Sequence, residues 1–265
     1  MSEVTENNKK TVGRNKTALF NSMRAVAWVN DLKRRTGISG DEKLMNTVTP
    51  PGQVLDIRFG RYLSGKTVPS QMIRNFVHQY PPVAKSQNVY EIGPEENKEF
   101  IPFWMLFENR YEEYWSVIEN VISLHDTDDV GRHVNRIDRL AAVFLPDQEW
   151  AAILEKRDFF TLSAEPLSNS VKRGFFKPEL RLLAAVIALW RLSLFIRDGV
   201  APMEYLLSSL LEEPYKEMLA DYGIYDQVCL LVRAISVQHH ALAGNIEAAS
   251  RNFANLEVES GSVKP

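Results

Sequence analysis

The sequence contains a single cysteine, Cys229, among its 265 residues. One cysteine can form neither an intramolecular disulfide nor a zinc site built from cysteines, and its scarcity is typical of a reducing cytoplasm. Long apolar runs are also missing, because the longest, residues 182–190, is far shorter than the ~20 residues of a membrane span. The polar residues at the start of the chain lack the apolar core of a secretory signal. These absences predict a cytoplasmic protein with no membrane partner.

Catalytic signatures are scarce as well. The chain has no Gly-x-Ser-x-Gly or His-Glu-x-x-His pattern. The segment 125–129 gathers histidine and aspartate, but it is more typical of a loop in which an aspartate caps the next helix. His239 and His240 are adjacent on a predicted helix, so their side chains diverge. We therefore expect no catalytic residue, no cofactor and no metal site.

Charge is distributed unevenly along the chain. The net charge is −3, yet residues 1–90 carry 14 Lys/Arg and 6 Asp/Glu, a net charge of +8. The remainder carries 17 basic and 28 acidic residues, a net charge of −11. A basic first third on an acidic body is typical of a nucleic-acid-binding head, although a dipolar surface without a polyanion partner has the same pattern.

The spacing of apolar residues predicts a mainly α fold with two helical domains. An N-terminal bundle has expected helices at about 17–36, 41–48, 53–63 and 70–79. A connector with strand character at 88–92 follows, and then helices at about 104–124, 130–144, 147–158, 178–198, 202–220, 222–242 and 245–256. The expected organisation is a flexible basic arm (1–16), a helix-turn-helix domain (17–82), a connector (83–103), a helical interaction domain (104–258) and a tail (259–265).

The segment 58–70 has two incompatible interpretations. Gly60–Thr67 fits G-x-x-x-x-G-K-[ST], the phosphate-binding loop of nucleotide hydrolases, which would use Gly60, Gly65, Lys66 and Thr67. That loop requires a buried strand before it and a helix after it, within a parallel sheet. Its interior here is bulky, and the chain shows no alternation of apolar strands with helices. The phosphate loop is therefore the less favoured alternative.

The second interpretation is a DNA-reading helix that ends in a glycine turn. An aromatic residue, Tyr62 or Phe59, precedes Gly65, and Pro69-Ser70 then opens the next helix. Over residues 17–80 this pattern resembles the Cro/repressor-like, Xre-type helix-turn-helix domains. The chain departs from that pattern in the long, proline-containing turn at 46–52 and in lacking a glutamine early in the second helix.

Further along, Tyr80-Pro81, Ile92-Gly93-Pro94 and Phe103-Trp104 look like a loose group of uncharacterised bacterial proteins often associated with mobile elements. The resemblance implies a DNA-binding protein, either a transcriptional regulator or the DNA-docking subunit of a mobile-element or defence assembly. Its partner would be double-stranded DNA, and its helical domain would mediate homo-oligomerisation or contact with a protein partner. A helical adaptor that binds protein but no DNA is a further alternative.

Side-chain chemistry suggests how the DNA-binding residues would divide their roles. Arg58 and Arg61 can make bidentate bonds to guanine, and Gln53 can pair with adenine. Phosphate contacts suit Lys43, Ser64, Lys66, Thr67 and Arg74, unless these side chains merely solvate a helix face. The basic residues of the N-terminal arm, Lys9, Lys10, Arg14 and Lys16, could enter the minor groove.

Overall fold

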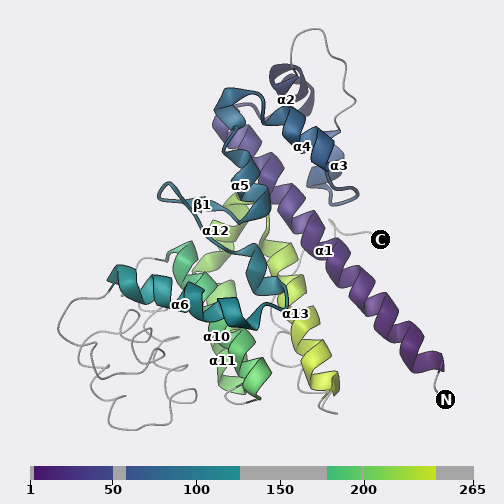
Figure 1. The fold of residues 1–265 in the computed structure, drawn as a ribbon, viewed down its shortest axis with the longest axis vertical. Helices are drawn as coiled ribbons and strands as arrows, with labels where there is room; N and C mark the ends of the chain where they lie inside the picture. Colours follow the sequence, from purple (N-terminus) through teal and green to yellow (C-terminus); the bar gives the residue numbers. More distant parts are fainter. Residues whose placement is uncertain (1–2, 50–57, 126–177, 198–199, 243–265) are drawn as a thin grey trace. The chain divides into compact units, whose positions relative to one another are not determined.

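The computed structural model describes residues 3–49, 58–125, 178–197 and 200–242. Over these residues the fold is mainly α, as predicted, with a single two-stranded sheet. The chain divides into two compact units, which we describe separately (Figure 1). Unit 1 contains residues up to Phe100 together with Leu219–Ile235, and unit 2 contains Ile101–Met218 and the chain from Ser236 to the end of the last described helix.

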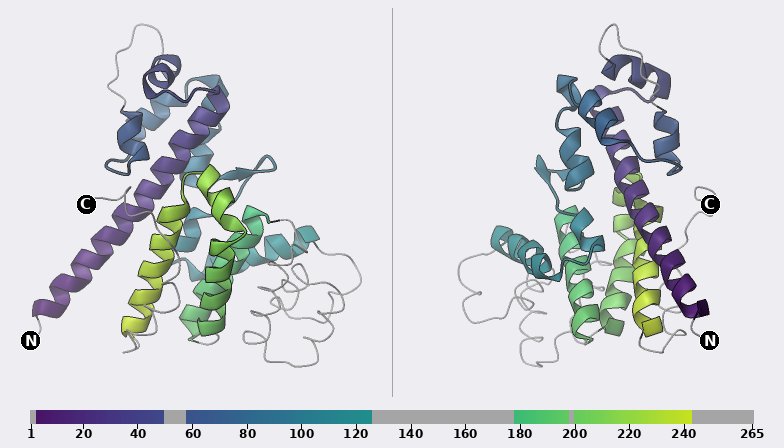
Figure 2. Two further views of the ribbon diagram at one scale, coloured as in Figure 1. Left: turned by 180° about the vertical axis from the view of Figure 1, so that it is seen from behind. Right: turned by 45° about the vertical axis from the view of Figure 1, so that its right-hand side comes forward.

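Unit 1 is organised around one long helix, α1, at Glu3–Thr36. We expected this helix to begin near residue 17 after a flexible arm, but it already begins at Glu3. Short helices gather along its C-terminal half (Figure 2). They are α2 (Asp41–Val48), α3 (Phe59–Leu63), α4 (Gln71–Val77), the 3-10 helix η1 (Pro81–Val83) and α5 (Ser86–Glu91).

The expected strand character at 88–92 is wrong, because these residues form most of α5 and the residue that follows it. The sheet lies further along, where β1 (Glu95–Glu96) pairs antiparallel with β2 (Glu99–Phe100). Asn97 and Lys98 between them both have positive φ, 52° and 69°, as a tight type I′ hairpin turn requires. Two apolar residues of α5, Val89 and Tyr90, are buried in unit 1, so tertiary packing overrides their strand propensity.

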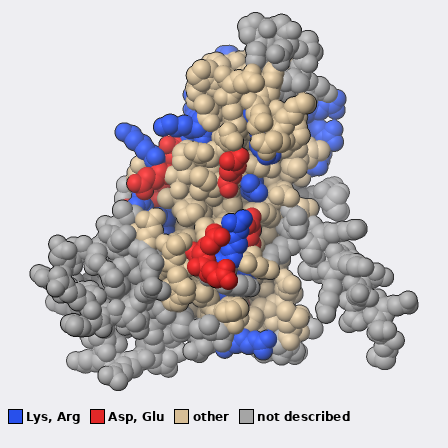
Figure 3. Space-filling model, in the orientation of Figure 1, with Lys and Arg blue, Asp and Glu red and all other residues tan. Residues whose placement is uncertain are grey.

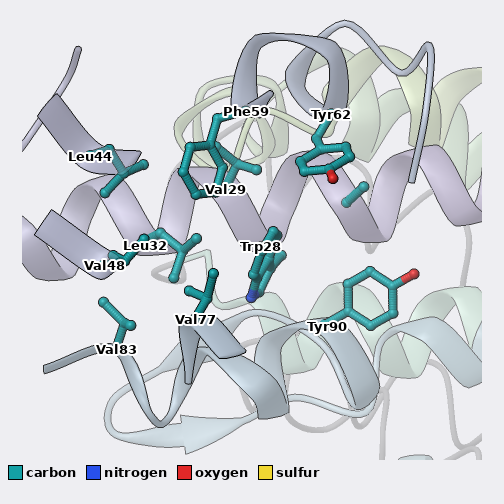
Figure 4. Close-up of a cluster of buried hydrophobic side chains, with 11 residues drawn as sticks. Trp28, Val29, Leu32, Leu44, Val48, Phe59, Tyr62, Val77, Val83 and Tyr90 are labelled. Carbon is teal, nitrogen blue, oxygen red and sulfur yellow. The ribbon is translucent and has the colours of Figure 1, made fainter. Parts of the chain in front are cut away.

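Trp28 lies at the centre of the unit 1 core (Figure 4). Its ring centroid is 6.0 Å from that of Phe59, 6.3 Å from that of Tyr62 and 6.5 Å from that of Tyr90. The inner face of α1 has helical spacing, with Ala25, Trp28, Val29 and Leu32 all buried. Aliphatic side chains from the short helices complete the cluster: Leu44, Val48, Val77 and Val83. Each such burial stabilises the fold by about 1.5–3 kcal/mol before chain entropy is counted.

Unit 2 is built around α10, Leu180–Ile196. Every residue from Leu182 to Leu194 is buried, and α10 packs against α6 (Tyr111–His125), α11 (Val200–Glu212) and the 3-10 helix η2 (Trp104–Phe107). The helix expected at 202–220 is two helices, α11 and α12 (Tyr215–Asp221), because Pro214 has no N–H to continue the ladder. The last described helix, α13 (Tyr225–Leu242), belongs to unit 1 as far as Ile235 and to unit 2 from Ser236. The helices expected at 130–144, 147–158 and 245–256 lie outside the described residues.

Candidate nucleic-acid interface

The two glycines of the phosphate-loop pattern have packing roles in this structure. Gly60 lies within α3, and a Cβ there would come within 2.8 Å of the Asp41 carboxylate. Gly65 has φ +68°, and its Cβ would lie 2.3 Å from the Ser22 hydroxyl oxygen. Such an approach is closer than a side-chain carbon tolerates, and positive φ is itself costly for any residue with a Cβ. Close packing against α2 and α1 therefore accounts for both glycines.

The segment also lacks the geometry of a phosphate loop. Residues 61–63, which would form the loop interior, are helical, and Tyr62 is buried. The next helix does not start at Lys66 or Thr67 but at Gln71. The one sheet within the described part of the chain is the antiparallel pair β1–β2. Backbone amides are thus not arranged here as in a strand–loop–helix phosphate cradle.

The glycine turn and the helix start that the sequence pattern predicts between residues 65 and 71 are present. Gly65 forms the left-handed turn after α3, and Ser70 caps α4 by accepting a hydrogen bond from the Ile73 N–H at 3.3 Å. Pro69 is buried immediately before the cap, two residues before Gln71, the first residue of α4. The aromatic–glycine–Pro-Ser pattern therefore builds a short helix, a tight turn and a second capped helix.

Most of the predicted DNA contacts that the structure describes are exposed on α3 and the turn after it. Arg58, Arg61, Ser64 and Lys66 all expose their side chains there, and Lys and Arg gather along the edge of unit 1 beside α3 (Figure 3). Lys43 is exposed on α2, which packs against α3. Residues 57–90 contain five Lys/Arg and no Asp or Glu, so no carboxylate within this segment offsets its positive charge. Two carboxylates, Asp41 and Glu42, belong to the neighbouring α2, and Asp41 pairs with Lys33.

Arg74 and Thr67 differ from the expectation, because both are half-buried. The Arg74 guanidinium lies 4.0 Å from the centroid of the Tyr90 ring and donates a hydrogen bond to the Pro69 carbonyl at 3.0 Å. Arg24 lies over the same ring at 4.6 Å and donates to the Tyr90 carbonyl. These cation–π and hydrogen-bond contacts make Arg74 a packing residue of α4 rather than a freely exposed phosphate contact.

Two groups of predicted contacts cannot be placed. Gln53, the expected adenine contact, lies outside the described residues. The backbone of Lys9, Lys10, Arg14 and Lys16 belongs to α1, but their side chains are outside the described part of the structure.

The cations at the C-terminal end of α1 are held by carboxylates, unlike those on α3. Lys33 pairs with Asp41 at 2.8 Å. Buried Asp31 accepts hydrogen bonds from Arg34 and Arg35, both at 2.6 Å, and Arg35 also pairs with Glu95. In the described part of the chain no ion pair holds the Arg61 or Lys66 side chain, so their charges face solvent uncompensated.

His78 adds no charge to this surface at neutral pH. The Trp28 indole N–H donates to its Nε2 at 3.0 Å, which requires a neutral imidazole with an unprotonated Nε2. Burial, and then the neighbouring Arg74 cation, lowers the pKa of His78 to about 4, with Glu91 opposing the shift. His78 thus ties α4 to the centre of the core as a neutral acceptor.

Unit 2 contains a cluster of polar groups in its interior. Glu204 is fully buried and accepts a hydrogen bond from Ser236, while His240 Nε2 lies 3.1 Å from its Oε2. Burial, and then the adjacent His240, lowers the pKa of His239. Among the described residues, no three His, Cys, Asp or Glu side chains come together as metal ligands would. The exposed cations of unit 1 therefore remain the strongest candidate site.

No protein-family model, curated protein or solved structure matches this chain. None of the described helices combines the length and the apolar character of a membrane-spanning segment.

The sequence-based prediction overlooked the outer face of α4. Gln71, Met72 and Asn75 are all exposed there. A signal was available, because these positions are spaced i, i+1 and i+4 and therefore share one face of a helix. The phosphate-loop and glycine-turn patterns end at or before Ser70, and Arg74 was the one contact predicted on α4.

Proposed function

We propose that unit 1 binds double-stranded DNA through α3, the turn that follows it and the adjoining α4. The observation that carries the proposal is the absence of Asp and Glu from residues 57–90, where Arg58, Arg61 and Lys66 are exposed. Duplex DNA carries one negative charge per about 1.7 Å of its axis, and Lys and Arg that neutralise phosphates release condensed counterions. A carboxylate within residues 57–90 would repel the phosphate backbone of the DNA.

Within this proposal the exposed side chains have distinct roles. Arg58 and Arg61 carry guanidinium groups, which can bond two acceptors on a guanine edge or a phosphate. Lys66 and the Ser64 hydroxyl, in the turn after α3, suit phosphate contacts that position the protein without reading sequence. The ordered core beneath them, with Phe59 and Tyr62 packed on Trp28, fixes the direction in which α3 presents these groups.

In a cell, such a protein would act as a transcriptional regulator or as the DNA-docking subunit of a larger assembly. The acidic, helical unit 2 is then the part that contacts a protein partner or a second copy of the chain. A paired arrangement would suit two DNA half-sites.

The test is fluorescence anisotropy of the full-length protein with a labelled random-sequence duplex, at salt concentrations from about 50 to about 200 mM. The double variant Arg61→Ala/Lys66→Ala removes two exposed cations from α3 and its turn. We expect its plot of log K against log salt to be shallower by about 2, since each phosphate contact contributes about 0.9 to the slope. Lys216→Ala, which removes an exposed cation from α12, is the matched control and should leave the slope unchanged.

Two results would contradict the proposal. The first is no binding by the wild-type protein at the lowest salt concentration. The second is a double variant with the affinity and slope of the wild type, because binding would then depend on another surface.

A further inference from the structure

The outer face of α4 consists of uncharged residues on a basic surface. Ile73, Phe76 and Val77 face inward and pack in the unit 1 core, so the exposed positions are Gln71, Met72 and Asn75. Met72 is 69% exposed, which is unusual for a large apolar side chain in this unit. The face therefore presents two amides and a thioether side chain to solvent.

Several exposed helix faces in the described chain have a different composition, although the exposed end of α13 (Val237, Gln238, Leu242) also lacks carboxylates. Glu42 is exposed on α2, Glu112 and Glu113 on α6, and Glu217 and Asp221 on α12. Carboxylates solvate those faces, whereas α4 has none although its environment is strongly basic. Solubility alone does not require amides at these positions, and amides are the side chains that can approach a phosphate backbone and still carry both a donor and an acceptor.

A chain of hydrogen bonds fixes how these amides point. Arg74 donates to the Gln71 Oε1, and the Gln71 Nε2 donates to the Asn75 Oδ1 at 2.7 Å. Because a guanidinium can only donate, Gln71 must turn its oxygen toward Arg74 and its NH₂ toward Asn75. Asn75 must then accept with its oxygen, which leaves its own NH₂ and the second lone pair of Oδ1 for an external partner.

The Arg74 end of this chain is anchored in the core. Its guanidinium lies against the Tyr90 ring and is bonded to the Pro69 carbonyl, as described above. The orientation of Asn75 is thus set before any ligand arrives, which lowers the entropy lost on binding.

We propose that Asn75 reads an adenine in the major groove and that Met72 contacts a neighbouring thymine methyl group. Adenine presents an N7 acceptor and an N6 donor at that edge, which complement the NH₂ and oxygen of one asparagine. An α-helix with its side chains is about 10–12 Å in diameter, so α4 can enter a major groove about 12 Å wide. Gln71 is a positioning residue in this arrangement. The inference rests on the DNA binding proposed above and adds to it a base preference located on α4 rather than α3.

The experiment is a binding selection with full-length protein and duplexes that have a randomised core, followed by sequencing of the bound pool. It is run in parallel on the wild type, Asn75→Ala, Gln71→Ala and the control Asn46→Ala, which removes an exposed asparagine from α2. Circular dichroism melting checks that each variant is folded. Anisotropy with the unselected random duplex then measures affinity without sequence preference.

We expect the wild-type pool to contain a position with a strong preference for adenine. Asn75→Ala should reduce that preference about tenfold, because it removes a bidentate contact, and Gln71→Ala should reduce it by a smaller factor. Affinity for the unselected duplex and its salt slope should stay within about twofold of the wild type in both variants, since no phosphate contact is lost. Asn46→Ala should select the same pool as the wild type.

If wild-type protein binds the random duplex but Asn75→Ala selects an identical pool, the α4 inference is wrong while the DNA-binding proposal stands. A uniform loss of affinity for every duplex in Asn75→Ala would also contradict it, since that result indicates a phosphate contact. If the wild-type protein binds no duplex at all, the proposed function fails, and the inference fails with it.

Discussion

The charged side chains of two regions differ in burial. The first region is residues 58–90 of unit 1, and the second is helices α10 and α11 of unit 2. None of the charged side chains in residues 58–90 is buried, and all of those charges are positive. In unit 2, Arg191 of α10 and Glu204 of α11 are both buried. Exposed cations such as Arg61 and Lys66 are available to a polyanion, whereas buried and hydrogen-bonded charges are available only to the fold.

The buried charges of unit 2 are well supplied with hydrogen-bond partners. Arg191 donates to the Tyr114 hydroxyl at 3.1 Å, to the Glu108 carbonyl at 3.1 Å and to the Asn109 amide oxygen at 3.0 Å. Such groups would cost several kcal/mol if left unpaired, and their bonds therefore specify how α6 and the turn before it lie on α10. We conclude that the polar chemistry of this region is structural.

The largest expected effect tests whether the buried polar chemistry of unit 2 is structural. Ser236→Ala removes the hydroxyl that donates to the buried Glu204 carboxylate and should lower the free energy of unfolding by about 2–3 kcal/mol. Ser193→Ala is the matched control, because Ser193 is equally buried but donates to the Trp190 carbonyl at 2.8 Å, a neutral acceptor. Its cost should stay below about 1 kcal/mol. Chemical denaturation measures both, and equal losses would show that the Glu204 charge adds nothing.

A second comparison concerns the turn that presents the exposed cations of unit 1. Gly65→Ala introduces a left-handed alanine and a contact with Ser22, and should cost about 2 kcal/mol. Gly37 has nearly the same φ, +67°, but no atom within 4 Å of its Cβ position, so Gly37→Ala should cost only about 1 kcal/mol.

Hydrogen exchange of the peptides covering α3 and α4 locates the effect of Gly65→Ala. Adding Ser22→Ala to Gly65→Ala should recover part of the loss by removing the hydroxyl that the new methyl group meets. Equal costs at the two glycines would mean that the close approach to Ser22 has no energetic role.

The smallest expected effect is a pH dependence confined to unit 1. The folded-state pKa of His78 is about 4, below its ordinary value of 6.5, so protonation favours the unfolded chain. The stability that comes from neutral His78 is complete above pH 6.5 and is lost as the pH falls toward 4. Because His78 is half-exposed and screened by solvent, we expect a loss of about 1–2 kcal/mol.

Thermal melts across this pH range, compared with His78→Gln, isolate the histidine from the carboxylates that also titrate. Glutamine keeps an acceptor for the Trp28 indole but has no titrating group. A variant with the same acid sensitivity as the wild type would show that His78 is not responsible.

The sequence by itself determined the properties that depend on composition and on local backbone chemistry. Helical spacing predicted a mainly α chain, and charge counting placed the excess of basic residues in residues 1–90. The turn at Gly65 and the cap at Ser70 could also be predicted, because positive φ and a free side-chain oxygen are local requirements. Most of the predicted contacts on α3 and its turn are indeed exposed together.

Only the tertiary structure decided which neighbour covers each side chain. Arg58 and Arg74 are equally basic in the sequence, yet Arg58 is exposed whereas Arg74 packs on the Tyr90 ring and donates to Gln71. Val89 and Tyr90 have strand propensity, but α1 offers them a core and they become helical. Gly60 and Gly65 fit a phosphate-loop pattern in the sequence. In the structure, Asp41 lies close to Gly60 and Ser22 lies close to Gly65, so packing explains both glycines. Periodicity identifies which residues share a face of a helix. Contacts between segments that are distant in the sequence decide whether that face is buried or exposed.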